Sequence, residues 1–132
     1  MLPSQPAALS GATTALDYLE QSKSRITPPS GSIAVQALIS AIDISSLERQ
    51  ITEALDNGYR ALKLKVAATD AATDAKRIEI ATTLIAPEIL LRLDANGGWT
   101  PQEALHVLTK VTPGRVALVE EPTSDPKDWR QI

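Results

Sequence analysis

The chain has 132 residues, of which 43% are hydrophobic and 22% are charged, and this composition is typical of one globular domain. Its formal net charge of -3 gives no basic excess, so we expect no nucleic-acid partner and no attachment to an anionic membrane surface. No apolar run approaches the roughly 20 residues of a membrane span, and the N-terminus lacks a signal-peptide pattern, so we expect a cytoplasmic protein.

The first predicted element is an amphipathic helix over residues 7–20, where apolar side chains recur at helical spacing. A PPSG break at residues 28–31 follows, and it divides the chain into a lead-in segment, 1–30, and a main domain, 31–132. After the break an apolar strand, a polar loop, a helix and a Gly or Pro turn recur with a period of roughly 27 residues. The predicted strands cover residues 33–39, 61–66, 89–93 and 116–119.

Helix-start signals follow each of these strands, near residues 45, 73, 100 and 125. Ser45 and Glu48 have the spacing of a capping box, which predicts the start of the first helix. Thr100 suits an N-cap, with Pro101 at the first helical position and Glu103 three residues after the cap. Strands and helices therefore alternate along the main domain.

This alternation predicts a parallel sheet joined by right-handed crossovers. A doubly wound open sheet and a (β/α)8 barrel share the pattern, and periodicity does not distinguish them. A barrel typically needs about 250 residues, so four strand–helix units would make half of one. Such a half has two unpaired strand edges, through which copies of the chain could associate unless another segment covers them.

Lysine and leucine side chains alternate in the second predicted strand. Lys63 and Lys65 share one face with Ala61, while Leu62 and Leu64 share the other. The leucines suit packing under helices, where an unpaired ammonium would be desolvated. In a barrel the lysines would face inward near the C-terminal rim, where the active sites of such barrels lie; on an open sheet they would be solvated edge residues.

Acidic residues end the next two strands. The same alternation places Arg92 and Asp94 together at the end of the third strand, and Glu120 at the end of the fourth. The chain has no cysteine and one histidine, which leaves oxygen ligands and favours a hard cation. Two carboxylates at neighbouring strand ends could share one Mg²⁺, although both could also simply begin their loops.

Two carboxylates beside a lysine indicate a specific chemistry, the removal of a proton from the carbon next to a carboxylate. The intermediate needs a divalent cation to hold its negative charge. The lysine must be uncharged when it takes the proton, and like-charge repulsion from a second ammonium favours that form.

Three segments carry a family resemblance: GYRALKLKVA, LRLDANGGWT and VALVEEPTSDPKDW. In this order, about one strand–helix unit apart, they resemble the muconate-lactonizing subgroup of the enolase superfamily. The opening LPSQPAALSGATTALDYL, followed by VQALI, is similar to the end of the capping region and the first barrel strand of o-succinylbenzoate synthases. The resemblance implies a partial (β/α)8 TIM barrel, preceded by a short helix of the capping region.

The resemblance also implies roles for individual residues. Lys65 would abstract the proton and then help hydroxide leave as water, while Lys63 would tune it and help hold the substrate carboxylate. Asp94 and Glu120 would be ligands of Mg²⁺, for which Mn²⁺ is the alternative. The residues that would orient these ligands or lie beneath the metal are Asn96, Glu121 and Arg92.

The implied activity is that of a lyase, which dehydrates 2-succinyl-6-hydroxy-2,4-cyclohexadiene-1-carboxylate to o-succinylbenzoate on the way to menaquinone or phylloquinone. The alternatives are a dipeptide epimerase or N-acylamino acid racemase of the same subgroup, and a noncatalytic half-barrel that dimerises. Enzymes of the subgroup take a third acidic ligand from the fifth strand and a second lysine from the sixth. We therefore expect this chain to be a fragment that alone binds Mg²⁺ weakly and turns over little or no substrate.

The other polar and aromatic residues are assigned to structure. Asp43, Asp70 and Asp74 are expected to be loop or helix-start acids. Trp99 and Trp129 flank helix starts and are expected to anchor the loops by packing.

Overall fold

The computed structural model describes residues 6–23 and 33–132, which divide into two compact units, Met1–Ile33 and Ala34–Ile132. The first unit contains the helix α1 (Pro6–Lys23), on which Leu16, Tyr18 and Leu19 are exposed. The helix predicted over residues 7–20 is confirmed, whereas the break predicted at 28–31 lies outside the described residues. Within the described ranges, no helix combines the length and the apolar character that crossing a membrane requires.

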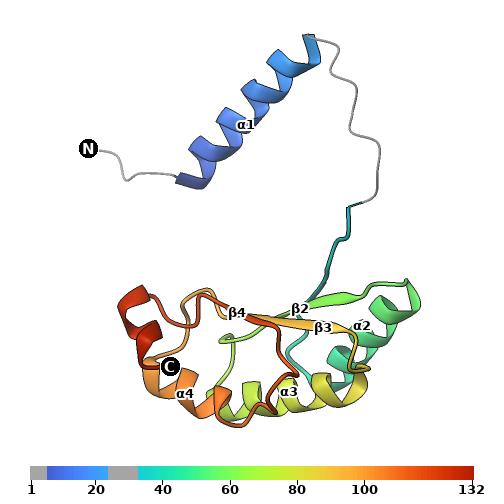
Figure 1. The fold of residues 1–132 in the computed structure, drawn as a ribbon, viewed down its shortest axis with the longest axis vertical. Helices are drawn as coiled ribbons and strands as arrows, with labels where there is room; N and C mark the ends of the chain where they lie inside the picture. The colour runs from blue at the N-terminus through green and yellow to red at the C-terminus, as the bar shows by residue number, and fades with distance from the viewer. Residues whose placement is uncertain (1–5, 24–32) are drawn as a thin grey trace. The chain divides into compact units, whose positions relative to one another are not determined.

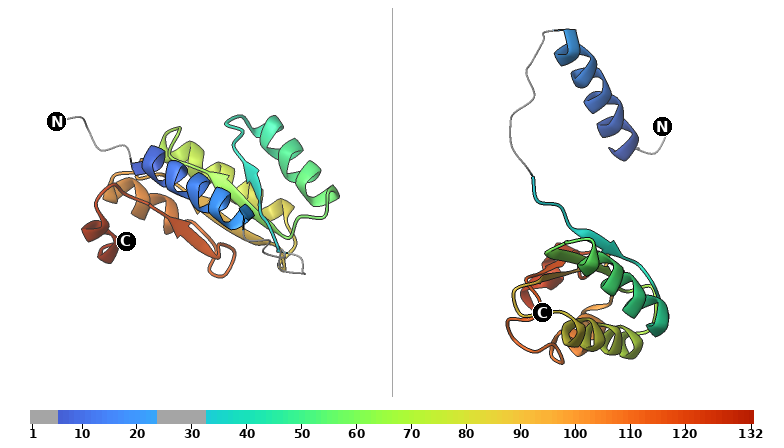
Figure 2. Two further views of the ribbon diagram at one scale, coloured as in Figure 1. Left: turned by 90° about the horizontal axis from the view of Figure 1, so that it is seen from above. Right: turned by 90° about the vertical axis from the view of Figure 1, so that its right-hand side faces the viewer.

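The second unit is built on a parallel sheet with the strand order β1-β2-β3-β4. Figure 1 shows its α-helices on one side of this sheet, and in Figure 2 they follow one another across it, α2 against α3 and α3 against α4. The elements are β1 (Ala37–Ile39), α2 (Ile44–Asp56), β2 (Ala61–Lys65), α3 (Ala71–Leu84), β3 (Leu90–Asp94), α4 (Pro101–Leu108), β4 (Leu118–Glu120) and the 3-10 helix η1 (Pro126–Arg130).

This one-sided arrangement decides between the two folds that the sequence pattern allowed. A doubly wound sheet has helices on both faces, whereas strands in sequential order with all helices outside form the wall of a barrel. The unit is therefore a partial (β/α)8 barrel of four strands.

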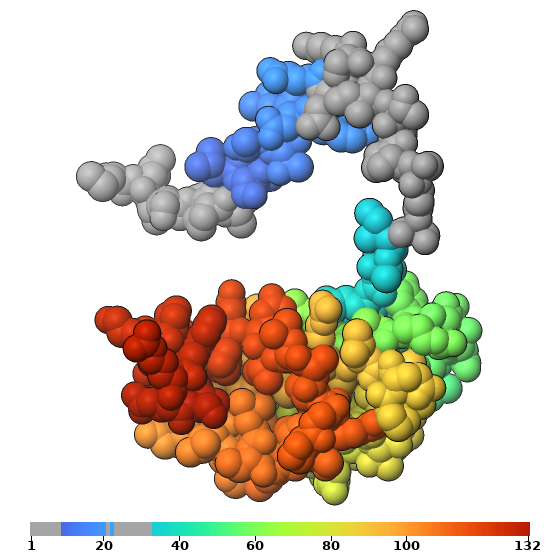
Figure 3. All heavy atoms as spheres, in the orientation of Figure 1, coloured from blue at the N-terminus to red at the C-terminus, as the bar shows by residue number. Residues whose placement is uncertain are grey.

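The helix-covered face of the sheet is apolar. Leu62 and Leu64 of β2, together with Leu91 and Leu93 of β3, are at most 1% exposed. They pack with side chains of the helices, among them Leu47, Ile51, Ile78, Ala81, Ala104 and Val107. These side chains form the core between the strands and the helices. Figure 3 shows the outer surface that encloses this core, in the orientation of Figure 1. The alternation predicted for β2 is confirmed, because its leucines are buried while its lysines are partly exposed.

The opposite face, called the open face below, has no helix over it within residues 34–132. It presents Leu38, Leu90 and Leu118, which are 58%, 48% and 50% exposed. In a closed barrel such inward positions are filled by layers of side chains from the other strands.

The helix starts depend on capping side chains. The Thr100–Glu103 capping box is confirmed: the Thr100 hydroxyl accepts from the Glu103 amide at 3.2 Å, and the Glu103 carboxylate accepts from the Thr100 amide at 2.9 Å. The box predicted at Ser45 is wrong, because Asp43 caps α2 instead and accepts from the Ser46 amide at 2.9 Å. An aspartate two residues earlier competes successfully for the same free amides.

Several elements differ from the predictions, with the larger differences in β1, β4 and the final helix. β1 is shorter than residues 33–39, since Ile33 and Val35 are 86% and 65% exposed and β1 pairs with β2 only from Ala37 onward. β4 lies at Leu118–Glu120, two residues later than predicted at its start. The final helix is the short 3-10 helix η1, capped by Asp125. Apolar composition predicts strand character, but pairing with a neighbour determines where a strand begins.

Candidate active site

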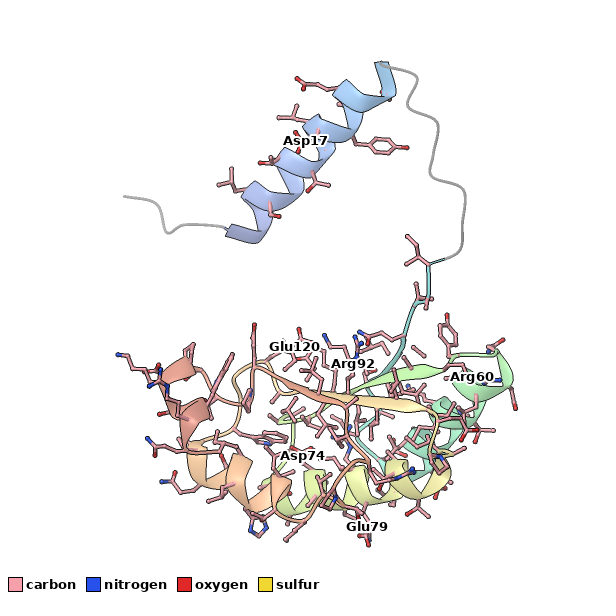
Figure 4. The ribbon with its side chains drawn as sticks, in the orientation of Figure 1. Asp17, Arg60, Asp74, Glu79, Arg92 and Glu120 are labelled. Atoms are coloured by element: carbon pink, nitrogen blue, oxygen red, sulfur yellow. The ribbon has the colours of Figure 1, made fainter. Side chains whose placement is uncertain are left out.

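The candidate site lies at the carboxyl-terminal edge of the sheet, on the open face. The parallel register pairs Lys65 with Asp94 and Asp94 with Glu120, so the three residues form one row across β2, β3 and β4. Lys63 and Arg92 pair in the row below. Figure 4 shows Glu120 and Arg92 on the side of the sheet that faces away from α3.

Ion pairs join the lysines and carboxylates of the two rows. Oδ2 of Asp94 lies 2.7 Å from Nζ of Lys63 and 2.7 Å from Nζ of Lys65. The same Lys63 nitrogen lies 2.8 Å from Oε2 of Glu120. Asp94 is 1% exposed, so its charge is removed from water and compensated by two ammonium groups.

These contacts shift the pKa values of both partners. Burial raises the pKa of Asp94, but hydrogen bonds from Lys63 and Lys65 and from the Asn96 amide outweigh burial, and the net pKa lies below its ordinary value. Hydrogen bonds to Asp94 and then to Glu120 raise the pKa of Lys63. The Asp94 carboxylate and the Lys63 ammonium are therefore both charged at neutral pH.

The three remaining predicted site residues have different surroundings. Asn96 joins the cluster directly: its side-chain oxygen accepts from Nζ of Lys65, and its amide donates to Oδ1 of Asp94 at 3.1 Å. Arg92 donates to Oε1 of Gln36 at 3.3 Å in the row below the carboxylates. Glu121 contributes its main-chain carbonyl, which accepts from the Gly97 amide at 2.7 Å. The structure thus brings Asn96 into the cluster and leaves the Arg92 side chain beside Gln36.

Backbone strain is concentrated at this edge of the sheet. Ala67, Asn96 and Glu121 are non-glycine residues with φ values of 62°, 45° and 43°, and each follows the end of β2, β3 or β4. Left-handed φ values are uncommon for such residues and persist where the surrounding structure determines them, often at functional sites. Nothing in the local sequence around Ala67 indicates this conformation.

A buried ion pair beneath the site is the main feature that the sequence did not reveal. Asp74 and Arg77 of α3 are 0% and 1% exposed, and Oδ1 of Asp74 lies 2.8 Å from Nη1 of Arg77. Asp74 does lie in the first turn of α3, as expected, but it is fully buried. The i, i+3 spacing of the two charges on the face of α3 that also carries Ile78 and Ala81 is the signal that could have identified the pair.

The two carboxylates meet part of the needs of a divalent cation. Asp94 and Glu120 converge on one cationic group, the Lys63 ammonium, and their carboxylates are the oxygen ligands that Mg²⁺ prefers. Within residues 6–23 and 33–132 no group of three His, Cys, Asp or Glu side chains is arranged to hold a metal. The residues therefore fit Mg²⁺ as a two-carboxylate part of a site, whose other positions require further oxygen ligands.

The fold and this site define the class of protein. Residues 46–132 match the family model described as enolase C-terminal domain-like, and the match covers more than half of the chain. The chain belongs to this family, the barrel domain of the enolase superfamily.

Individual relatives differ in activity. The L-Ala-D/L-Glu epimerase of Bacillus subtilis (strain 168) is 36% identical over 86 residues, which cover 61% of this chain and 24% of that protein. The o-succinylbenzoate synthase of Aliivibrio salmonicida (strain LFI1238) is 32% identical over 126 residues, which cover 93% of this chain and 36% of the synthase. The chain thus spans about a quarter to a third of the length of these relatives.

A solved structure has the same fold. The dipeptide epimerase from Cytophaga hutchinsonii, complexed with Mg and the dipeptide D-Ala-L-Val, superimposes with a TM-score of 0.64 at 28% sequence identity. The match covers 70% of this chain and 25% of the epimerase. Its complex shows that a relative with this barrel binds both Mg and a small molecule.

Proposed function

We propose that this chain contributes the base and two metal ligands of an Mg²⁺-dependent site that removes a proton from the carbon next to a carboxylate. The observation that supports this proposal is the row formed by Lys65, Asp94 and Glu120 at the carboxyl-terminal edge of the sheet. It places a lysine amine beside two carboxylates that converge on a cation. Active sites of barrel enzymes lie at this edge.

The residues have distinct roles in the proposed reaction. Lys65, in its uncharged form, accepts the proton at Nζ, and the electrons of the broken C–H bond remain on the substrate. Asp94 and Glu120 would hold Mg²⁺, which would supply electrostatic stabilisation for the negative charge on the substrate carboxylate. Lys63, whose ammonium lies beside Asp94 and Glu120, would tune Lys65 and help hold the substrate carboxylate. Lys65 then returns its proton to the departing hydroxide, which leaves as water.

The substrate we propose is 2-succinyl-6-hydroxy-2,4-cyclohexadiene-1-carboxylate, which would be dehydrated to o-succinylbenzoate. The match to the Aliivibrio salmonicida synthase supports this choice, because it covers 93% of the chain, whereas the match to the Bacillus subtilis epimerase covers 61%. Epimerisation of a dipeptide is the second candidate, supported by the higher identity of 36% and by the dipeptide in the related epimerase structure. Both reactions begin with the same proton abstraction by Lys65.

The proposal is tested on the purified 132-residue chain with Mg²⁺ and each substrate in turn. Formation of o-succinylbenzoate is followed by absorbance, and exchange of the α-proton of L-Ala-L-Glu is followed by NMR in D2O. We expect Mg²⁺-dependent dehydration that is slow at most, because Asp94 and Glu120 are two carboxylates and no group of three acidic side chains is arranged to hold a metal among the described residues. The variant Lys65→Met should reduce this rate about 10²–10⁴-fold, which is the usual contribution of a general base.

Lys76→Met is the matched control, because Lys76 is an exposed lysine of α3. Its rate should equal that of the wild type. Faster exchange of the dipeptide α-proton than dehydration would favour the epimerase. Turnover that is independent of Mg²⁺ or unaffected by Lys65→Met would contradict the proposal, whereas absent turnover would agree with an incomplete metal site.

A further inference from the structure

The buried carboxylate of Asp74 lies directly beneath the end of β2 and receives four hydrogen bonds. Its Oδ1 accepts from Nη1 of Arg77 at 2.8 Å and from the Thr69 hydroxyl at 3.0 Å. Its Oδ2 accepts from the Ala67 amide at 2.7 Å and from Nε1 of Trp99 at 3.0 Å. Each buried oxygen of Asp74 therefore has two hydrogen-bond donors in place of water.

Arg77 extends this network to the carbonyl groups of two strand ends. Its Nη2 donates to the Lys65 carbonyl at 2.9 Å and to the Ala41 carbonyl at 2.7 Å. The planar guanidinium holds several acceptors in one fixed geometry, which a lysine ammonium does not. Arg77 therefore connects α3 to the main chain of Lys65 itself.

Trp99 connects the network to the loop that follows β3. It is 4% exposed, and its indole reaches Asp74 across the loop that follows β2. The two loops approach closely, since a Cβ on Gly98 would lie 2.8 Å from Cβ of Ala67. One carboxylate, Asp74, therefore contacts both of the loops that follow Lys65 and Asp94.

We propose that Asp74, Arg77 and Trp99 are positioning residues for Lys65, an inference that rests on the proposed function of Lys65 as the base. They hold the main chain on both sides of residue 66: Arg77 binds the Lys65 carbonyl, and Asp74 binds the amide of Ala67. The Lys65 side chain leaves from the opposite face of the sheet, where it contacts Asp94. Figure 4 shows Asp74 between the sheet and the helices, on the other side of the sheet from Glu120.

The φ of 62° at Ala67 shows why such a network is needed. A left-handed alanine is disfavoured and is retained only when its neighbours determine it. If Ala67 relaxed, the end of β2 would move and carry the Lys65 amine with it. Misplacement of a reacting group by about 1 Å can reduce a rate about 10²-fold.

Two conservative variants weaken the network. Trp99→Phe removes the indole N–H that reaches Asp74, and Arg77→Lys keeps a positive charge beside Asp74 but removes the forked donor to Lys65. Trp129→Phe is the control: it also removes one indole hydrogen bond, to the Thr123 carbonyl at 3.3 Å, but within the described residues Trp129 has no hydrogen bond to Asp74, Arg77 or Trp99.

The first measurement does not depend on turnover. NMR of the 132-residue chain, with ¹³C-labelled lysine and ¹⁵N-labelled alanine, follows the Lys65 CεH2 signal and exchange of the Ala67 amide. We expect a shifted, broadened Lys65 signal and at least about tenfold faster Ala67 exchange in Trp99→Phe and Arg77→Lys, because both lose restraints on this segment. The exposed Lys110 should keep its signal, and Trp129→Phe should match the wild type throughout.

Unchanged Lys65 and Ala67 signals in Trp99→Phe would overturn the inference, as would equal changes at Lys65 and Lys110, which indicate a general loss of structure. If Arg77→Lys does not fold, Trp99→Phe alone decides. In the dehydration assay Trp99→Phe should lower kcat about tenfold or more at unchanged KM, because the substrate does not contact the network. Failure of the proposed function would give a different result: the wild-type chain would turn over substrate at a rate that Lys65→Met does not change.

Discussion

The two faces of the sheet contribute differently to this protein. On the helix-covered face, Leu62, Leu64, Leu91 and Leu93 are at most 1% exposed. They are most of the strand residues that belong to the hydrophobic core. On the open face, β2, β3 and β4 present charged residues that interact with one another at the carboxyl-terminal edge. Because side chains alternate along a strand, neighbouring residues serve stability and chemistry separately.

The buried ion pair is the exception to this division. Asp74 and Arg77 are charged residues in the apolar layer, and together they contact the backbone of Lys65 and Ala67. The helix layer thus supports the site from behind as well as stabilising the fold. Removing one member of such a pair leaves an uncompensated buried charge, which is why conservative changes are preferred as tests.

Two neighbouring leucines of β3 test the difference between the two faces of the sheet. Leu91 is 1% exposed on the covered face, and Leu90 is 48% exposed on the open face. We expect Leu91→Ala to lower the free energy of unfolding by about 2–5 kcal/mol, and Leu90→Ala by less than about 1 kcal/mol, because only the first leaves a cavity in the core. Urea denaturation monitored by circular dichroism measures both, and equal losses would show that the open face is covered in solution.

A smaller effect is expected at Gly98, where the loop that follows β3 approaches the loop that follows β2. Gly98→Ala would place a methyl group 2.8 Å from Cβ of Ala67 and 3.0 Å from the Ala95 carbonyl. We expect a loss of about 1–3 kcal/mol in the free energy of unfolding, as is usual for overpacking. Combining the change with Ala67→Gly, which removes the opposing methyl group, should recover part of the loss in a double-mutant cycle. If the stability changes of Gly98→Ala and Ala67→Gly are additive, the two residues are not in close contact.

The open face is tested through its affinity for Mg²⁺. Lys63 neutralises Asp94 and Glu120, so a divalent cation that binds both carboxylates must compete with it. We expect Lys63→Met to lower the Kd for Mg²⁺ about threefold to tenfold, a change of up to about 1.4 kcal/mol. Isothermal titration calorimetry measures this affinity, with Lys76→Met as the control and Asp94→Asn expected to weaken binding. Weaker binding by Lys63→Met would contradict convergence of the two carboxylates on one cation.

The smallest effect concerns the start of α2, in the helix layer. Hydrogen bonds from the Ser46 amide and from the Ser45 hydroxyl lower the pKa of Asp43 from 3.8 to about 2. A lowered pKa in the folded state means that the ionised cap stabilises the fold above pH 3.8, and that this contribution disappears as the pH falls through about 2. The residue is exposed, so solvent screening keeps the contribution small.

Asp43→Asn is the matched variant, because asparagine also caps helices but does not titrate. Thermal melting at several pH values should show wild type more stable than the variant at pH 5, with the difference closing toward pH 2. A difference that is constant across this range would show that the charge of Asp43 makes no contribution.

Much of the fold could be predicted because its signals are local. The Thr100–Glu103 capping box and the alternation in ALKLKV each depend on residues within a few positions of one another, and the structure confirms both. The start of α2 was predicted wrongly because Asp43 and Ser45 offer competing caps, and composition does not rank them. The early start predicted for β1 failed because residues 33–36 have strand-like composition but do not pair with β2.

The sequence by itself determined which residues share a face of each strand and therefore which charged groups end the strands at one edge. Only the tertiary structure decided that Lys63 and Lys65 share one oxygen of Asp94, that Asp74 is buried, and that Ala67 is left-handed. The reason is the range of the interactions. Lys65 meets Asp94 across 29 positions of the chain and Asp74 meets Trp99 across 25, so these contacts exist only once the strands have paired and α3 has packed beneath them.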